Sequence, residues 1–386
     1  MPGIYFHIPF CKQACNYCNF HFSTSLLPRN EMIDSMINEL RLTKASDAAG
    51  NLEVIDTIYF GGGTPSLLTI AEIKKLLEAV HQYCNVTENA EITLEANPDD
   101  INEVKLAECK SIGINRFSIG IQSFKEEDLV WMNRAHNAEQ ALRSIHLVKD
   151  AGYQNYSVDL IYGTPTLSDE DWEKNIQTVI DLSVPHISCY ALTVEIKTVL
   201  HKLISLKKIE DVDPERQAAQ FLLLINWLTD AGYEHYEISN FAKPGYRSKH
   251  NSSYWLGESY IGIGPSAHSF NGLSRRWNVS NNALYLQSLQ KNVIPFEEEK
   301  LTETQRLNEY IMTSIRTIEG IDLDFVKKKF GKNASRRLEA TSKKFIEDYK
   351  LQAINCKLVL TNEGKLFADG IAADLFFEEE INVFEA

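Results

Sequence analysis

Residues 4–18 read Ile4-Tyr5-Phe6-His7-Ile8-Pro9-Phe10-Cys11-Lys12-Gln13-Ala14-Cys15-Asn16-Tyr17-Cys18. Ile4–Ile8 is rich in strand-forming residues and predicts a first β-strand, and three of the seven cysteines of the chain follow it with C-x3-C-x2-C spacing. Cysteines gathered in this way favour a shared metal centre over three unrelated buried thiols. One possibility is a zinc ion with His7 or His21 as fourth ligand. The other is an iron–sulfur cluster whose fourth iron stays open for a substrate or cofactor.

From residue 54 to about residue 240 the chain repeats a β-rich run, a polar or glycine turn and an amphipathic segment. The β-rich runs are Val54–Phe60, Glu91–Glu95, Arg116–Gln122, Tyr156–Ile161 and His186–Leu192. Alternating strands and helices indicate parallel β/α units, in an open sheet or a barrel. With Ile4–Ile8 they predict six strands. Barrel enzymes place their chemistry at the C-terminal ends of the strands, which is where the cysteines lie.

The rest of the chain has a different pattern. Residues 241–300 are rich in Gly, Pro, Ser and Asn, and we interpret them as a connecting segment between residues 1–240 and residues 301–386. After Thr302 the pattern indicates three helices and then a short β pair, Leu358–Leu360 and Leu366–Ala368, around the turn Thr361–Gly364. This order predicts a small winged-helix-like domain.

Composition narrows the class of protein. The chain has 386 residues, 44% of them hydrophobic, and a formal net charge of −14. The acidic balance weighs against a nucleic-acid binder, which normally carries a basic surface. No apolar run approaches the roughly 18 residues that span a bilayer, and no secretory signal is evident. The few cysteines favour a reducing compartment, so we expect a cytoplasmic protein. On the charge balance and the lack of long apolar runs, we also expect no nucleic-acid binding and no integral membrane segment.

Polar residues recur at the ends of the predicted strands. Gly61-Gly62-Gly63-Thr64-Pro65 follows one strand, and such glycines allow a ligand close to the backbone or simply make a tight connection. Glu95 and Gln122 end the next two strands. Arg134 offers a guanidinium fork for a carboxylate, and Asp159 lies in an apolar strand where a buried carboxylate needs a partner. Together they predict a ligand site at one edge of the sheet.

The cysteine segment closely resembles the radical S-adenosylmethionine (SAM) enzymes. The resemblance implies a 4Fe–4S cluster held by Cys11, Cys15 and Cys18, with SAM chelated to the open iron and cleaved to a 5′-deoxyadenosyl radical. It also implies that Tyr17 packs on the adenine side. Further SAM-contacting or cofactor-binding candidates on the same basis are Tyr5, Gly62, Gly63, Thr64, Glu95, Gln122, Arg134 and Asp159.

Within these enzymes the chain resembles the branch of oxygen-independent coproporphyrinogen dehydrogenase and of the HemW-type heme chaperones. The dehydrogenase motif continues to a fourth cysteine, whereas Asn19 and Phe20 follow Cys18 here. The dehydrogenase also carries a long N-terminal extension that helps to hold the tetrapyrrole, and the ten residues before Cys11 leave no room for it. His250-Asn251-Ser252-Ser253-Tyr254-Trp255 matches the H-N-x-x-Y-W element typical of the chaperones. Imidazole is a common axial ligand of heme, so His250 is a heme-site candidate, as a ligand or as a residue that shapes the site.

The resemblance implies a chaperone that binds heme and transfers it to an acceptor protein, with a flavodoxin or ferredoxin as electron donor. Two alternatives stay open: a true dehydrogenase that decarboxylates coproporphyrinogen, and a radical SAM enzyme for another substrate. No catalytic residue is assigned, and whether the chain is an enzyme is undecided.

Overall fold

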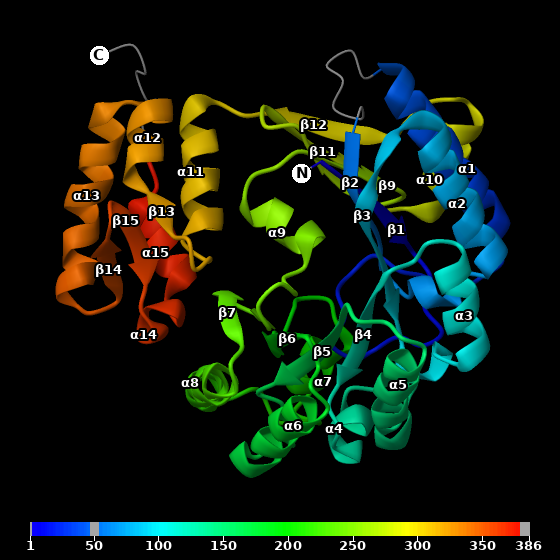
Figure 1. Cartoon of the computed structure of the whole chain (residues 1–386), viewed down its shortest axis with the longest axis horizontal. Coiled ribbons are helices and arrows are strands. Elements are labelled where there is room, and N and C mark those ends of the chain that lie inside the picture. Colours follow the sequence, from blue (N-terminus) through cyan, green and yellow to red (C-terminus); the bar gives the residue numbers. More distant parts are fainter. Residues whose placement is uncertain (1, 47–53, 379–386) are drawn as a thin grey trace.

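The structure, a computed structural model, describes residues 2–46 and 54–378 (Figure 1). Six neighbouring parallel strands form its centre. They are β1 Gly3–Ile8, β2 Val54–Gly62, β3 Asn85–Ala96, β4 Arg116–Gln122, β5 Tyr156–Tyr162 and β6 His186–Ala191. Each pairs with the next along the chain, so every connection runs through helical segments that return over one face of the sheet.

These returning segments begin at well-defined caps. Thr69 and Glu72 form a capping box at α2, and Asn137 and Gln140 form another at α5. The helices are α1 Arg29–Ser46, α2 Ile70–Tyr83, α3 Glu103–Ser111, α4 Glu126–Trp131, α5 Ala138–Asp150, α6 Asp169–Asp181, α7 Val199–Ser205 and α8 Pro214–Asp230, with short 3-10 turns at Pro65–Leu67 and Pro98–Asp100.

The strands are apolar on the side that faces the helices and polar on the other. Side chains alternate between the two faces of a strand. The helix-facing set is fully or almost fully buried in the main core and includes Ile58, Phe60, Leu94, Phe117, Ile119, Val158 and Ile187. The concave set includes Thr57, Tyr59, Glu95, Ser118, Asp159 and Ser188. The hydrophobic core therefore lies outside the curved sheet, and the lumen is lined with groups that can hydrogen-bond.

Residues 234–300 extend the same sheet at both edges. Beyond β6 lie β8 Asn240–Ala242 and β7 Glu234–Glu237, and beyond β1 lie β9 Tyr260–Ile263, β10 His268–Phe270, β11 Ser274–Asn278 and β12 Phe296–Lys300. α9 Lys249–Trp255 lies between the sheet and the C-terminal region, and α10 Asn282–Gln290 precedes β12 (Figure 1). The segment predicted as a connection thus contributes strands to both edges of the sheet, and the sheet runs open from β12 to β7.

The C-terminal region has its own core and a second, three-stranded sheet. Its elements are α11 Glu303–Ser314, β13 Ile321–Asp322, α12 Leu323–Phe330, α13 Lys332–Glu347, β14 Leu351–Ile354, β15 Lys357–Leu360, α14 Asn362–Lys365 and α15 Ala368–Leu375. The order from α11 to β15 is that of a winged helix. The prediction of an α/β fold, a partial barrel of six parallel strands with a small C-terminal winged-helix-like domain, is confirmed.

One detail of that prediction is wrong. The hairpin is formed by β14 and β15, and Thr361–Gly364 is not its turn, because Thr361 caps α14 and Leu366 follows that helix. The predicted division at residues 240 and 300 stays a prediction, and residues 379–386 of its third part lie outside the described residues. None of the helices in the described ranges is long and apolar enough to cross a membrane.

Candidate functional site

The cysteine loop after β1 is held in place by backbone and amide hydrogen bonds. Ser23 N–H donates to the Pro9 carbonyl oxygen (2.9 Å), and Cys11 N–H donates to that of Ser23 (3.0 Å). Asn16 donates from its backbone N–H to the Met132 carbonyl (3.1 Å) and from its side chain to the Trp131 carbonyl (2.8 Å). These contacts fix the loop before any ligand is present.

The triglycine turn packs against this loop. Gly63 N–H donates to the Ile8 carbonyl oxygen (2.8 Å), and Thr64 N–H donates to that of Phe10 (2.7 Å). A Cβ on Gly63 would lie 2.6 Å from the Phe10 carbonyl oxygen, and Gly62 has a φ of +105°. Because these glycines have no side chains, the turn after β2 can pack closely against the cysteine loop.

Two polar side chains contact the thiols. The Thr64 hydroxyl donates to the Cys11 sulfur (3.5 Å), and burial raises the pKa of the Cys11 thiol to about 11. Arg134 Nη1 lies 3.3 Å from both the Cys15 sulfur and the Tyr17 hydroxyl, while Nη2 donates to Asn97 Oδ1 and to the Gly120 carbonyl oxygen, both at 2.9 Å. Arg134 thus joins the cysteine loop to β4.

Glu95 lies next to the last residue of β3, and Asp159 lies in the middle of β5. Glu95 Oε1 accepts a hydrogen bond from the Tyr59 hydroxyl (2.8 Å), and its carboxylate also accepts one from Gly62 N–H. Burial, opposed by these two bonds, raises the pKa of Glu95 to about 8. The pKa of Asp159 is likewise raised by burial, although the Ser118 hydroxyl donates to its Oδ2 (3.2 Å).

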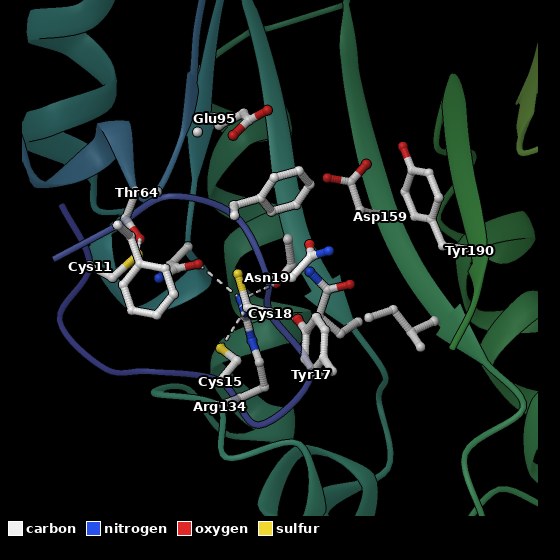
Figure 2. A pocket seen from close by; sticks show the side chains of 18 of the residues that line it. Cys11, Cys15, Tyr17, Cys18, Asn19, Thr64, Glu95, Arg134, Asp159 and Tyr190 are labelled. Carbon is white, nitrogen blue, oxygen red and sulfur yellow. Dashed lines mark hydrogen bonds between the residues drawn. The ribbon is translucent and has the colours of Figure 1, made fainter. Parts of the chain in front are cut away.

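A cavity of about 460 Å³ brings most of the predicted residues together (Figure 2). That volume falls within the roughly 300–1,000 Å³ range of small-molecule sites. The predicted residues on its wall are Cys11, Cys15, Tyr17, Cys18, Gly62, Gly63, Thr64, Glu95, Gln122, Arg134 and Asp159. In Figure 2 the cysteine loop and Arg134 lie across the cavity from Glu95 and Asp159. The edge predicted from the strand ends is therefore one continuous pocket.

Tyr5 and His250 do not line this cavity. The Tyr5 ring stacks on Tyr59, with ring centroids 6.0 Å apart, beneath the pocket. His250 is 1% exposed, and both its ring nitrogens are engaged: Nδ1 with Thr57 Oγ1 (2.7 Å) and Nε2 with the Tyr254 hydroxyl (2.8 Å). Burial lowers the pKa of His250 to about 3, so the ring is neutral.

Cys11, Cys15 and Cys18 are the side chains that could bind a metal centre in this cavity. No group of three or more His, Cys, Asp or Glu side chains within the described residues is already arranged to hold a metal ion. All three cysteines carry free, partly exposed thiols on one wall of the cavity. A cubane cluster takes each thiolate at a different iron, so three free thiols spread along one loop fit such a cluster.

Known proteins are similar to this chain in sequence and in fold. Residues 5–179 match the radical SAM superfamily, and residues 301–367 match the HemN C-terminal domain. The heme chaperone HemW of Bacillus subtilis is 30% identical over 374 residues, which cover 96% of this chain and 98% of the relative. The chain belongs to the HemW-type heme chaperones. HemW of Escherichia coli is 37% identical over 270 residues, 69% of each chain, and HemW of Lactococcus lactis is 30% identical over 384 residues.

A solved structure carries the same fold as this HemW-type chain. Coproporphyrinogen III oxidase (HemN) from Escherichia coli, described as a radical SAM enzyme, superposes with a TM-score of 0.82 over 98% of this chain and 91% of its own, at 21% identity. The radical SAM superfamily implies a 4Fe–4S cluster and SAM for this HemW-type chain.

The structure adds wall residues that the sequence prediction missed. Asn97 holds Arg134, Ser118 holds Asp159, and Tyr190 lines the cavity from β6. Ser118 and Tyr190 could have been found, because each lies an even number of residues from another inward-facing position on its strand. Asn97, just beyond β3, carried no such signal.

Proposed function

We propose that this chain holds a 4Fe–4S cluster through Cys11, Cys15 and Cys18, binds SAM beside it, and binds heme for transfer to an acceptor protein. The observation that carries the proposal is the single cavity that brings the three thiols together with Glu95 and Asp159. Relatives that span nearly the whole chain bear the name heme chaperone. We further propose a reducing, cytoplasmic setting, with a flavodoxin or ferredoxin as electron donor.

Each wall residue has a proposed task in the cavity. The cluster, when bound and reduced, supplies the electron that cleaves the sulfonium of SAM. We propose that Glu95 and Asp159 accept hydrogen bonds from hydroxyl or ammonium groups of SAM and that Tyr17 packs on its adenine ring. Gln122 is held at a φ of +66°, and such strained positions persist where the surrounding structure over-determines them. Arg134 keeps Cys15 and Tyr17 in fixed positions relative to β4.

The charge of the cavity favours the chaperone over the dehydrogenase. Coproporphyrinogen carries four carboxylates, and a pocket for it needs several cations. Among the described residues that line the cavity, Arg134 is the one Lys or Arg, and it is already hydrogen-bonded to four protein atoms. Glu95, Asp159 and Glu195 also line the cavity. A tetra-anionic substrate would find no lysine or arginine besides Arg134 among these lining residues.

Two histidines, His250 and His268, are candidates for the axial ligand of heme. His250, the sequence candidate, would have to lose two buried hydrogen bonds before its ring could bind iron. His268 on β10 is exposed, and no hydrogen bond to its ring is found within the described residues. Its ring centroid lies 6.4 Å from that of Trp277 on the paired strand. We therefore propose His268 as the axial-ligand candidate to compare with His250.

The test is an anaerobic hemin titration, followed by the Soret band, on reconstituted wild type, His250→Ala and His268→Ala. His146→Ala, on the surface of α5, serves as the control. We expect saturable one-to-one binding in wild type that weakens in His268→Ala and persists in the control. Weakening in His250→Ala alone would support the sequence candidate. Unsaturable binding in every protein would contradict heme binding, and turnover of coproporphyrinogen would favour the dehydrogenase.

Iron analysis of the same preparations tests the cluster. Wild type should hold about four irons. Cys15→Ala should hold little iron while keeping its secondary structure, because the loop is anchored through Cys11, Asn16 and Ser23 backbone contacts. Stoichiometric zinc in place of iron would contradict the assignment.

A further inference from the structure

His250 lies at the end of the barrel opposite to the cysteine loop. Its partner Thr57 belongs to the N-terminal half of β2, and a Cβ on Gly3 at the start of β1 would lie 3.1 Å from the His250 ring. His250 N–H also donates to Glu91 Oε1 on β3 (3.0 Å). The H-N-x-x-Y-W element, which forms α9, therefore closes the base of the lumen and contacts the first three strands.

A column of aromatic rings leads from this base to the cavity. The His250 ring stacks on the Tyr59 ring, with centroids 4.9 Å apart and planes inclined by 21°. Tyr59 is buried, and its hydroxyl donates to Glu95 Oε1 on the cavity wall (2.8 Å). Two contacts thus connect His250 to a carboxylate on the wall of the proposed SAM site.

The hydrogen bonds of His250 leave its ring one orientation. Thr57 and Tyr254 bind opposite nitrogens, and the Tyr254 ring meets His250 edge-on, with centroids 5.0 Å apart. A flat ring fixed in this way limits where the Tyr59 ring can lie, because buried side chains of close-packed interiors have little room to shift. The Tyr59 ring in turn sets the position of its hydroxyl and of Glu95.

We infer that His250 is a positioning residue for the SAM site: it fixes Tyr59, and Tyr59 fixes Glu95. The inference rests on the proposed SAM site and gives the H-N-x-x-Y-W element a task other than heme ligation. A purely structural role, closing the barrel base, predicts instead that any weakening of α9 has the same effect as loss of the imidazole.

The experiment is a double-mutant cycle on the SAM dissociation constant of anaerobically reconstituted protein, with His250→Ala, Tyr59→Phe and the double variant. Equilibrium dialysis gives the constant, and the change in the EPR spectrum of the reduced cluster on SAM addition gives a second readout. We expect each single change to weaken SAM binding about tenfold. The double variant should be little weaker than either single one, because both changes break the same chain of contacts.

Ser248→Ala is the matched control. Ser248 caps α9 through a hydrogen bond from Asn251 N–H and contacts Glu91, but it does not touch the ring column. We expect it to lower stability and leave SAM affinity unchanged. If His250→Ala fails to fold, His250→Gln takes its place in the cycle, and iron content is measured for every variant.

Different results would contradict the positioning role of His250 and the proposed SAM site. Multiplying effects in the double variant, unchanged SAM affinity in His250→Ala, or equal loss in Ser248→Ala would each overturn the positioning role. Wild type that holds its cluster but binds no SAM would overturn the proposed SAM site instead.

Discussion

Gly61 has no room for a side chain. A Cβ built on it would lie 2.8 Å from Tyr5 Cε2, 2.9 Å from Tyr59 Cε1 and 3.0 Å from Glu95 Oε1. Real Cβ atoms do not approach other atoms so closely, so an alanine must displace the Tyr59–Glu95 pair or the ring of Tyr5. The triglycine turn therefore has one residue that touches the ring column and one, Gly63, that touches the cysteine loop.

We predict that Gly61→Ala weakens SAM binding about tenfold while the protein keeps its iron, because the Tyr59–Glu95 hydrogen bond is strained and the cysteine loop is not. Gly370→Ala is the control, since a Cβ there meets nothing within 4 Å. Equilibrium dialysis with SAM compares the two. Unchanged affinity in Gly61→Ala would show that Glu95 does not depend on this close packing.

Some site residues could be predicted from the sequence, whereas the contacts of His250 could not. The thiols and the strand-end carboxylates were predictable because spacing and alternation place them on one edge. The partners of His250 were not, because Thr57 lies 193 residues away in the chain and only the folded barrel brings it near. An imidazole in a matching motif gave no sign that both nitrogens would be occupied.

The β14–β15 hairpin turns through two residues in the left-handed region, Asn355 with a φ of +50° and Cys356 with a φ of +60°. Two-residue hairpin loops of this kind favour Asn followed by Gly. Asn tolerates the conformation, whereas cysteine pays a steric cost at its Cβ.

We predict that Cys356→Gly raises the free energy of unfolding of the C-terminal region by about 1 kcal/mol. Cys356→Ala keeps the Cβ and should give no gain, which separates backbone relief from loss of the thiol. Urea unfolding followed by far-UV circular dichroism measures both. An equal gain in the two variants would point to the exposed thiol rather than to the turn.

The same hairpin shows which elements sequence could predict. The six parallel strands were located to within a few residues, apart from the early start of β3 at Asn85, because apolar runs bounded by turns and amphipathic segments are strong signals. The β14–β15 pair was misplaced because Thr361-Asn362-Glu363-Gly364 has turn-forming residues that instead cap and build a short helix. Strands β7–β12 have three to five residues each and are stabilised by pairing at the sheet edges rather than by their own pattern.

The molecule as a whole buries several imidazoles. Burial lowers the pKa of His7 and His136 to about 4 and that of His235 and His250 to about 3. These rings stay neutral in the folded chain and take up protons once it unfolds, so below about pH 6.5 the unfolded state binds more protons. Buried carboxyl groups act in the opposite direction, because burial raises the pKa of Glu95 to about 8, that of Glu39 to about 7, and those of Asp128, Asp159 and Glu237 above their usual values. The contribution of one histidine is therefore separated by comparing a variant with wild type.

We predict that each buried histidine lowers the stability of the cluster-free protein as the pH drops from 6.5 towards 4, against the opposite effect of the buried carboxyl groups. Each of the four histidines contributes up to about 1.4 kcal/mol per pH unit over that window. Urea unfolding at pH 7, 6 and 5 measures the slope, and His136→Gln should lessen it by the share of one proton. The same pH dependence in His136→Gln and in wild type would contradict a neutral buried ring at His136.

The pairing order of the sheet has a consequence for synthesis on the ribosome. β1 lies between β2 and β9, so the strand that carries the cysteine loop has its second neighbour only when residues 260–263 have been made. At about 5–20 residues per second, roughly 13 to 50 seconds separate the emergence of β1 from that of β9. Throughout that interval one edge of the strand offers unpaired backbone groups to any nascent chain or chaperone nearby. The strand that carries the cysteine loop therefore gains its full pairing only after more than two thirds of the protein has been translated.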